Sequence, residues 1–416
     1  MAGTISVRCC IAGGGPAGMM LGLLLARAGI DVLVLEKHAD FLRDFRGDTI
    51  HPSTLEIIHE LGLLEQLLAL PHQKAPEITA RFGDLAVTVA DFSTLPTHCG
   101  FIAFMPQWDF LNFLADQGSG YSNFRLLMQA EVTELVQEAG KIVGLRAATQ
   151  DGQLEVRADL VVGEDGRHSV VREQAGLPVE EFGAPMDMLW FRLSRRAGDP
   201  ENPVGRFDQG RIFIMLNRGD YWQCGFVIPK GSRAQLEAQG LPAFRDQVAK
   251  LAPFMADRVG ELQIWEPVKL LTVQVNRLRD WCRPGLLCIG DAAHAMSPIG
   301  GVGINLAIQD AVAAANLLAD PLRRGAATLG DLRFVQERRA WPTQMTQRMQ
   351  LFLQNRVIKA VLSGEGPLVP PWPLRLIARF PFLRRIPARV IGMGFRPEHV
   401  RTQSANGAPG SSLVRK

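Results

Sequence analysis

Three short stretches of this sequence place glycines or carboxylates directly after apolar segments. The first contains Gly13, Gly15 and Gly18 in the pattern G-x-G-x-x-G, after the largely apolar residues 7–12. Glycines at this spacing permit a tight turn and let backbone N–H groups approach a pyrophosphate closely. The chemistry indicated is dinucleotide binding at the start of a helix, whose free N–H groups and dipole favour anions.

The elements around this motif are those that a dinucleotide-binding unit requires. Residues 7–12 predict a buried strand, residues 21–28 a helix that ends at Gly29, and residues 31–35 a second strand. Glu36 follows, where a carboxylate can accept hydrogen bonds from ribose hydroxyls and would repel the 2′-phosphate of NADP. The alternative is a glycine-rich turn in some other strand–helix–strand unit.

The other two stretches repeat the combination of a strand end and a carboxylate. Asp165 follows a predicted strand at 160–162, and Asp291 follows one at 286–289. Beyond Asp291, a glycine-rich loop leads into a helix expected from about Gly303. Two helix N-termini and two ribose-type carboxylates suit one extended ligand, so FAD fits this arrangement better than NAD, which a single unit usually holds.

In this order and spacing, the stretches resemble the signature of the single-component FAD-dependent aromatic hydroxylases, class A flavoprotein monooxygenases with a p-hydroxybenzoate hydroxylase-like fold. The resemblance runs from about Val7 to Met345. It implies an α/β chain with a Rossmann-type, glutathione-reductase-like FAD-binding domain, a β-sheet substrate domain and C-terminal helices. The cofactor contacts expected are Gly13, Gly15, Pro16, Ala17, Gly18, Glu36, Lys37, Arg46, Gln107, Val132, Asp165, Asp291, Pro298, Gly301, Gly303, Ile304 and Asn305.

Within that set, the resemblance implies that Asp291 binds the ribityl chain and that Pro298 borders the flavin ring. It associates the stretch 165–172 with both FAD and NAD(P)H. NADH or NADPH would bind transiently and reduce FAD, and the reduced flavin would react with O2 to give a C4a-hydroperoxide that hydroxylates an aromatic or polycyclic small molecule. The sequence has no second G-x-G-x-x-G motif for NAD(P)H, in line with transient binding. Catalytic side chains stay unassigned.

The segment 176–265 is expected to supply the substrate site. Residues 211–229 predict a β-hairpin with its turn at 217–220. One face of this hairpin would cover the flavin ring, or would be an ordinary core-facing surface, and it is expected to carry Phe213, Met215, Tyr221 and Gln223. These four side chains include no arginine, which favours a neutral, apolar and larger substrate over a benzoate.

Two histidines and two tryptophans are expected to have structural rather than catalytic roles. His294 is expected to support its loop, His51 is not expected to be catalytic, and Trp190 and Trp222 are expected in the core. The stretch around Cys224 is similar to the Trp-x-Trp-x-Ile-Pro signature of flavin halogenases but lacks the second Trp. A halogenase, an isoprenoid reductase, an FAD oxidase or dehydrogenase, and a non-catalytic nucleotide-binding regulator therefore stay as alternatives.

The composition of the chain bears on its partners, its cysteine chemistry and its location. The 416 residues carry a net charge of +3 and no RNA- or DNA-binding motif, so nucleic acid is not an expected partner. Six scattered Cys suggest neither disulfides nor a metal site and fit the cytoplasm. The expected domains are 1–75 plus 97–175 plus 270–345 for FAD, 76–96 plus 176–269 for substrate, 346–401 for a C-terminal helical cap, and 402–416 for a disordered tail.

The C-terminal region is rich in arginine and proline. Its short helices are expected to pack as a cap on the flavin domain with their arginines in solvent. The alternative is weak contact with a membrane surface, because apolar and basic residues interleave as they do in interfacial helices. The oligomeric state is left open.

Overall fold

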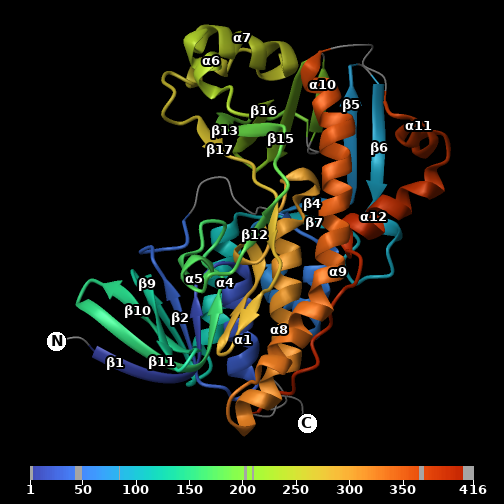
Figure 1. Ribbon diagram of the computed structural model, residues 1–416. Coiled ribbons are helices and arrows are strands. Elements are labelled where there is room, and N and C mark those ends of the chain that lie inside the picture. The colour runs from blue at the N-terminus through green and yellow to red at the C-terminus, as the bar shows by residue number, and fades with distance from the viewer. Residues whose placement is uncertain are drawn as a thin grey trace.

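The computed structural model describes residues 3–42, 49–83, 85–200, 204–208, 210–364 and 370–405. Figure 1 shows two sheet-based parts, with the larger sheet in the lower half of the view and the smaller one in the upper half. Two long helices, α8 (Gly303–Arg324) and α9 (Leu329–Leu353), pack side by side. The α/β class predicted from the sequence is confirmed.

The larger sheet has eight strands and is parallel at its centre. Its path runs through β19 (Cys282–Arg283), β20 (Leu286–Cys288), β11 (Gly152–Gly163), β1 (Gly3–Ala12), β2 (Val32–Glu36) and β8 (Phe124–Met128). An antiparallel extension adds β10 (Lys141–Thr149) and β9 (Glu131–Glu138). All of β2 is buried, which explains its unbroken apolar run.

Helix α1 (Pro16–Arg27) contacts both α8 and α4 (Gln107–Ser119) beside this sheet. By length and composition, the segment Ile299–Arg324, which contains α8, could cross a membrane. However, 78% of its most apolar stretch is buried inside the protein, so α8 forms part of the core.

The smaller sheet has seven strands and lies in the upper part of Figure 1. Its order is β17 (Lys269–Leu271), β13 (Met186–Ser194), β16 (Tyr221–Pro229), β15 (Arg211–Asn217), β14 (Val204–Asp208), β5 (Glu77–Phe82) and β6 (Leu85–Asp91). One face packs under α7 (Leu241–Leu251), through which Phe244 and Val248 enter a buried aromatic cluster. We call this side of the sheet the far face and its opposite side the near face.

The remaining short elements lie between and around the two sheets. They are β3 (Thr49–Ile50), β4 (Gln73–Ala75), β7 (Ile102–Phe104), β12 (Val179–Glu181), β18 (Asn276–Leu278), α2 (Pro52–Glu60), α3 (Leu64–Leu68), α5 (Val170–Gln174), α6 (Arg233–Ala238) and the 3-10 turns η1 (Phe92–Thr94), η2 (Pro253–Met255), η3 (Val259–Glu261), η4 (Gly290–Ala292) and η5 (Ile299–Gly301). Strands β3 and β4 both pair with β7, and β12 pairs with β18.

The C-terminal region differs from the expected cap. The boundary placed at 345/346 falls inside α9, which continues through the π-helical turn η6 (Gln354–Ile358) into α10 (Lys359–Ser363). The next elements are α11 (Trp372–Arg379), η7 (Pro381–Arg384) and α12 (Arg385–Gly392). Helices α11 and α12 pack against β6 of the smaller sheet, and the carbonyls of Ile391 and Met393 also contact His51 and Gln309 of the larger part.

The start of the predicted tail is also ordered against the protein. Arg27 donates to the Thr402 carbonyl at 2.6 Å, and the Ala405 N–H donates to the Arg27 carbonyl at 2.9 Å. Residues 402–405 therefore anchor the chain at the end of α1. Residues 406–416 lie outside the described residues.

Candidate cofactor and substrate site

The carboxyl ends of three parallel strands meet at one edge of the larger sheet. The Gly13 N–H donates to the Leu35 carbonyl at 2.8 Å, which joins the loops after β1 and β2. The Glu164 N–H donates to Ala12 at 2.8 Å, and the Ile289 N–H donates to Gly163 at 3.0 Å. The three sequence stretches are thereby brought together, as parallel pairing requires.

The glycine positions in the first loop are fixed by close approach. A Cβ at Gly13, which has φ = 114°, would lie 2.3 Å from the Glu164 carbonyl oxygen, and one at Gly18 would lie 2.0 Å from the Gly13 oxygen. A Cβ at Gly15 would meet the Glu164 carboxyl at 2.6 Å. Glycine is the residue that avoids these overlaps, and it leaves the loop backbone bare toward a ligand.

The helix that follows is prepared to receive an anion. Gly15, which has no side chain to act as a cap, is the N-cap of α1, and Pro16 opens the helix. The Glu36 side chain is buried and accepts the Gly14 N–H at 3.1 Å and the His38 N–H at 3.0 Å. Glu36 thus ties the glycine loop to the end of β2, where a ribose would lie.

The Asp165 and Asp291 stretches are joined by arginines. Asp165 accepts the Ser169 hydroxyl and, at 3.1 Å, the Val171 N–H, so its carboxylate caps the start of α5. Arg172 donates to the Ala292 carbonyl at 3.2 Å. Asp291 lies on η4 with its side chain about one-third exposed (34%), and its nearest cation is Arg167 at 3.5 Å. Of the two carboxylates, Asp291 is the more accessible to a ligand.

The glycine-rich loop leads into α8 at Gly303, as the sequence predicted, and Val302 gives that helix no side-chain cap. Gly301 has φ = 63°, and a Cβ there would lie 2.6 Å from the Thr49 hydroxyl. That hydroxyl donates to the Gly301 carbonyl at 3.0 Å. Pro298, which directly precedes this turn, is partly buried.

The Asn305 side chain makes its hydrogen bonds within the protein. Its amide oxygen accepts the His51 N–H and the Thr54 hydroxyl, both at 2.8 Å, and its amide nitrogen donates to Thr49 and Gly301 carbonyls. These four hydrogen bonds use the donors and acceptors of the side chain. Asn305 therefore clamps the loop, and only its backbone is left for a cofactor.

His51 itself is fully buried. One ring nitrogen lies 2.8 Å from the Ile391 carbonyl. Burial lowers the pKa of His51 to about 4, although that carbonyl opposes the shift. The ring is neutral near pH 7, which suits a connection between the loop and α12 rather than proton transfer.

The other predicted cofactor contacts lie on different elements. Gln107 is the first residue of α4 and is half-buried, and Lys37 is exposed beyond the end of β2. Val132 is buried in β9, shortly after Ala130 donates to the Glu36 carbonyl at 2.9 Å. Arg46 lies outside the described residues.

Two buried acids near this edge were missed by sequence reasoning. Glu164 lies behind the glycine loop with one carboxyl oxygen that has no hydrogen-bond partner. Burial, reinforced by Asp291, Asp165 and Glu36, raises the pKa of Glu164 well above 4.5. A neutral carboxyl is compatible with a pyrophosphate nearby, and the glycine loop, Glu36 and Asp291 together fit FAD.

Asp310 is the second of these acids. It lies on α8, fully buried, and contacts the His294 ring at 2.5 Å and the Gly290 N–H at 3.3 Å. Burial opposes ionisation, but His294 and Arg339 together hold the pKa of Asp310 below its usual value. His294 is thus a structural residue beneath the η4 loop. Asp310 lies about two turns inside α8, and its place beneath the η4 loop depends on tertiary packing, so it gives no local sequence signal.

On the substrate side, the hairpin register overturns one expectation. Phe213 pairs with Phe226 and Met215 with Cys224, so both lie on the far face, in the cluster under α7. Gln223 pairs with Leu216, which places Tyr221 and Gln223 on the opposite, near face. The grouping of Phe213 and Met215 with Gln223 was wrong, because paired residues share a face and successive residues alternate.

The near face carries other side chains instead. Met188, Trp190 and Ile214 belong to one apolar cluster with Ile299, which directly follows Pro298. The Trp190 indole lies over Gly225, where a Cβ would come within 2.9 Å of it. Trp190 is thus partly buried against a core cluster on the near face, whereas Trp222 is fully buried on the far face.

Arginines do occur at the hairpin end of the near face, contrary to expectation. Arg218 donates to the Gln223 amide oxygen at 2.9 Å. Arg192 pairs with Gln223 across β13 and places its guanidinium 4.9 Å from the Tyr221 ring centre. The near face is thus apolar beside Ile299 and basic at its hairpin end.

The parallel sheet with its glycine loop, Glu36 and Asp291 defines a flavoprotein. A second sheet lies beside the loop that precedes α8. Residues 6–349 match the family described as "FAD binding domain", and the chain belongs to this family. It is an FAD-dependent monooxygenase.

The relatives agree with this assignment. The chain is 32% identical over 383 residues to 6-methylpretetramide 4-monooxygenase of Streptomyces rimosus, covering 92% of this chain and 91% of that protein. The structure of OxyS anhydrotetracycline hydroxylase from Streptomyces rimosus matches with a TM-score of 0.72 at 23% identity, over 93% of this chain and 76% of that one. PqsL, a probable FAD-dependent monooxygenase from Pseudomonas aeruginosa, matches with a TM-score of 0.72 at 22% identity, over 86% of this chain and 98% of that one. The two structural matches show the shared fold.

Proposed function

We propose that this enzyme uses NADH or NADPH and O2 to hydroxylate a polycyclic aromatic small molecule of the polyketide type. The observation that carries the proposal is the near-face cluster of Met188, Trp190 and Ile214 beside Ile299. Ile358 of η6 and Val361 of α10 pack in the same cluster, and an apolar wall that includes an indole suits flat, fused rings. The names of the Streptomyces rimosus relatives, which refer to 6-methylpretetramide and anhydrotetracycline, support the same substrate class.

The residues of the site have separable tasks. Gly13, Gly15 and Gly18 would admit the pyrophosphate, Glu36 the adenosine ribose, and Asp291 the ribityl chain. Pro298 would border the flavin ring. When bound, FAD accepts reducing equivalents from NAD(P)H and activates O2.

The near face would hold the substrate ring against the flavin edge and exclude water from it. Gln223 and its neighbouring arginines, Arg218 and Arg192, lie at the hairpin end of this surface. Phenolic or enolic oxygens of a substrate would find polar partners there, while the fused rings contact the apolar part.

The test is consumption of NADH and NADPH by the FAD-loaded enzyme across fused-ring phenols and single-ring phenols, with isotopically labelled O2. We expect stimulation by fused-ring compounds and one labelled oxygen in the product. Stimulated turnover that yields only H2O2 would reject hydroxylation of that compound. Halide incorporation would instead indicate a halogenase, oxidation without oxygen insertion an oxidase or dehydrogenase, and a protein that takes up no FAD a regulator.

A matched pair of variants locates the substrate. Trp190→Leu changes the near face, and Phe213→Leu changes the far face of the same sheet. We expect Trp190→Leu to raise KM for the fused-ring substrate about tenfold, the loss of one to two kcal/mol of aromatic contact. Phe213→Leu should lower stability and leave KM unchanged. Equal KM effects would show that the near face does not bind the substrate.

A further inference from the structure

The segment 370–397 combines high positive charge with exposed apolar side chains. It contains six arginines and no Asp or Glu. The segment folds into α11, η7 and α12 along the edge strand β6. Its charge is therefore not balanced by acids of its own.

Only one side of this segment is used for packing. Ala388 and Gly392 of α12 are buried, and Gly392 approaches Phe92 and Leu95 beside η1. Helix α11 has no buried residue. The remaining surface of these helices is left toward solvent.

That remaining surface, which we call the C-terminal apolar stripe, is formed by large side chains at helical spacing. Residues 372 and 376 lie one turn apart on α11, and residue 380 directly follows that helix. Residue 382 lies in η7 and residue 386, four positions later, in α12. The members and their exposed fractions are Trp372 70%, Leu376 43%, Phe380 43%, Phe382 64% and Ile386 57%.

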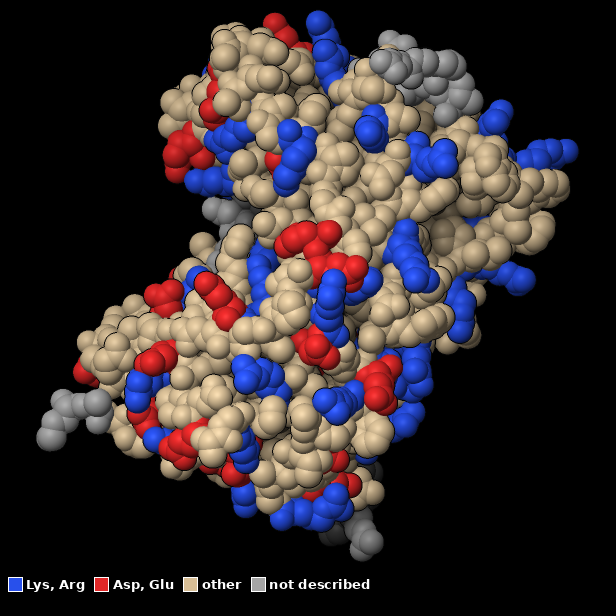
Figure 2. Space-filling view, viewed as in Figure 1, with Lys and Arg blue, Asp and Glu red and all other residues tan. Residues whose placement is uncertain are grey.

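Arginines border the stripe at regular intervals. Trp372, Leu376, Phe382 and Ile386 are each followed three residues later by an exposed arginine, namely Arg375, Arg379, Arg385 and Arg389. Figure 2 shows blue side chains and no red ones on the visible surface over α11 and α12, at the upper right of the view. The stripe is thus an apolar band bordered by positive charge.

Single exposed apolar residues are common on proteins, but five within fifteen residues form a patch that calls for a partner. We propose that the C-terminal apolar stripe docks on the surface of a membrane that carries anionic lipids. Aromatic and aliphatic side chains would enter the boundary between headgroups and acyl chains, and the arginines would contact lipid phosphates.

The positive charge around the stripe favours a membrane over a second copy of the chain. Two copies joined through the same stripe would bring arginines against arginines with no acid between them, which is unfavourable. An anionic bilayer offers negative charge beside an apolar layer. It therefore matches both the apolar stripe and the arginines that border it.

The test is co-sedimentation of the FAD-loaded full chain with vesicles of phosphatidylcholine alone and of phosphatidylcholine mixed with phosphatidylglycerol. We expect binding to the mixed vesicles at low salt, and weaker binding at higher salt because exposed charges are screened. Two double variants remove one component each: Trp372→Ser with Phe382→Ser, and Arg375→Gln with Arg379→Gln. Each should reduce binding about tenfold or more, because each removes about a kcal/mol or more per residue.

The matched control is Arg333→Gln with Phe334→Ser on α9, which removes another exposed arginine and another exposed aromatic ring. It should leave vesicle binding unchanged, and circular dichroism and FAD content should match the wild type in all variants. Absence of binding to the mixed vesicles, or equal binding by all variants, would overturn the proposal. Self-association that only the stripe variants abolish would overturn it in favour of a second copy.

Discussion

Arg339 and Arg258 are two buried arginines, one in each part of the molecule, with similar partners but different surroundings. Arg339 donates to Asp310 at 2.9 Å and to Glu398 at 3.3 Å. Arg258 donates twice to Asp199, at 2.6 and 3.0 Å, and to the Ser194 carbonyl at 2.8 Å. Each guanidinium satisfies a carboxylate that burial would otherwise penalise.

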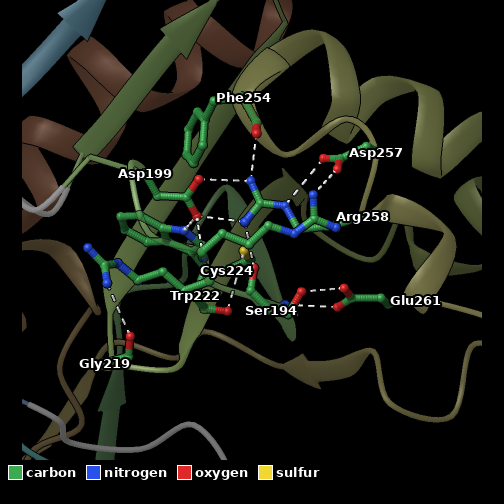
Figure 3. Close-up of polar contacts among 11 residues, drawn as sticks. Ser194, Asp199, Gly219, Trp222, Cys224, Phe254, Asp257, Arg258 and Glu261 are labelled. Atoms are coloured by element: carbon green, nitrogen blue, oxygen red, sulfur yellow. Dashed lines mark hydrogen bonds and ion pairs between the residues drawn. The ribbon is translucent and has the colours of Figure 1, made fainter.

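The difference lies in what each carboxylate also holds. Asp310 bonds His294 and the Gly290 N–H beneath the η4 loop, so the Arg339 cluster connects the cofactor edge to the C-terminal segment. Figure 3 shows that Asp199 instead bonds the Trp222 indole on the far face of the substrate sheet. The first cluster supports a binding loop, and the second supports only a domain core.

Breaking the Arg339 cluster should have the largest effect. Arg339→Met leaves Asp310 and Glu398 buried with fewer partners, and we expect the free energy of unfolding to fall by about 3–5 kcal/mol. Urea unfolding of the purified protein measures this loss. Because Asp310 also holds the Gly290 N–H, FAD content after gel filtration should fall as well. Full FAD content in a destabilised variant would separate the cluster from the cofactor loop.

Breaking the Arg258 cluster should cost less and leave the cofactor untouched. Hydrogen bonds from Arg258 hold the pKa of Asp199 well below its usual range despite burial, with the Trp222 indole adding to them. We expect Arg258→Met to lower the free energy of unfolding by about 2–3 kcal/mol, the value of hydrogen bonds to a charged group. FAD affinity should equal that of the wild type.

A second substitution serves as the control for Arg258→Met. Adding Asp199→Leu removes the unpaired carboxylate and should recover much of the lost stability, since apolar replacement of a whole buried pair is often neutral. Loss of FAD from either variant would contradict the separation between the two clusters.

Asp291 should show the converse pattern, with loss of cofactor and little loss of stability. Its pairing with Arg167 is long, at 3.5 Å, and both side chains are partly exposed, so the pair adds little to folding. Removal of a charged hydrogen-bond acceptor from FAD in Asp291→Ala should weaken FAD binding about 10- to 100-fold. Fluorescence titration of the apo-protein with FAD measures this change. A variant that stays fully yellow through gel filtration would reject the ribityl role.

These comparisons also show what the sequence could predict. The glycine loop, Glu36 and Asp291 were accessible to sequence reasoning because their roles depend on local order, a strand end followed by a turn and a helix. Asp310 and Arg339 were not, because their pairing depends on how α8 and α9 pack. The far-face position of Phe213 depends on hairpin register, which shifts every side chain to the other face when it is misjudged.

Substitution of Glu164 should change how stability depends on pH, and the sign of that change can be fixed. Its pKa is raised in the folded protein, mainly by burial, while in the unfolded chain it stays near 4.5. Above about pH 4.5 the unfolded chain therefore binds fewer protons than the folded one, and rising pH lowers stability through this group, by at most about 1.4 kcal/mol per pH unit. Gln at this position cannot ionise, so the stability of Glu164→Gln relative to wild type should increase from about pH 5 to about pH 8.

Glu155→Gln is the matched control for this prediction. Hydrogen bonds from Arg157 and Arg146 lower the pKa of Glu155 on the protein surface, so its carboxylate stabilises the fold above about pH 4.5. Relative to wild type, Glu155→Gln should show a small, constant loss of stability from about pH 5 to about pH 8, because this carboxylate is ionised in both the folded and the unfolded chain over that range. Urea unfolding at saturating FAD across this pH range measures both. Parallel curves for Glu164→Gln and wild type would mean that Glu164 is already ionised behind the glycine loop, where a pyrophosphate would then be repelled.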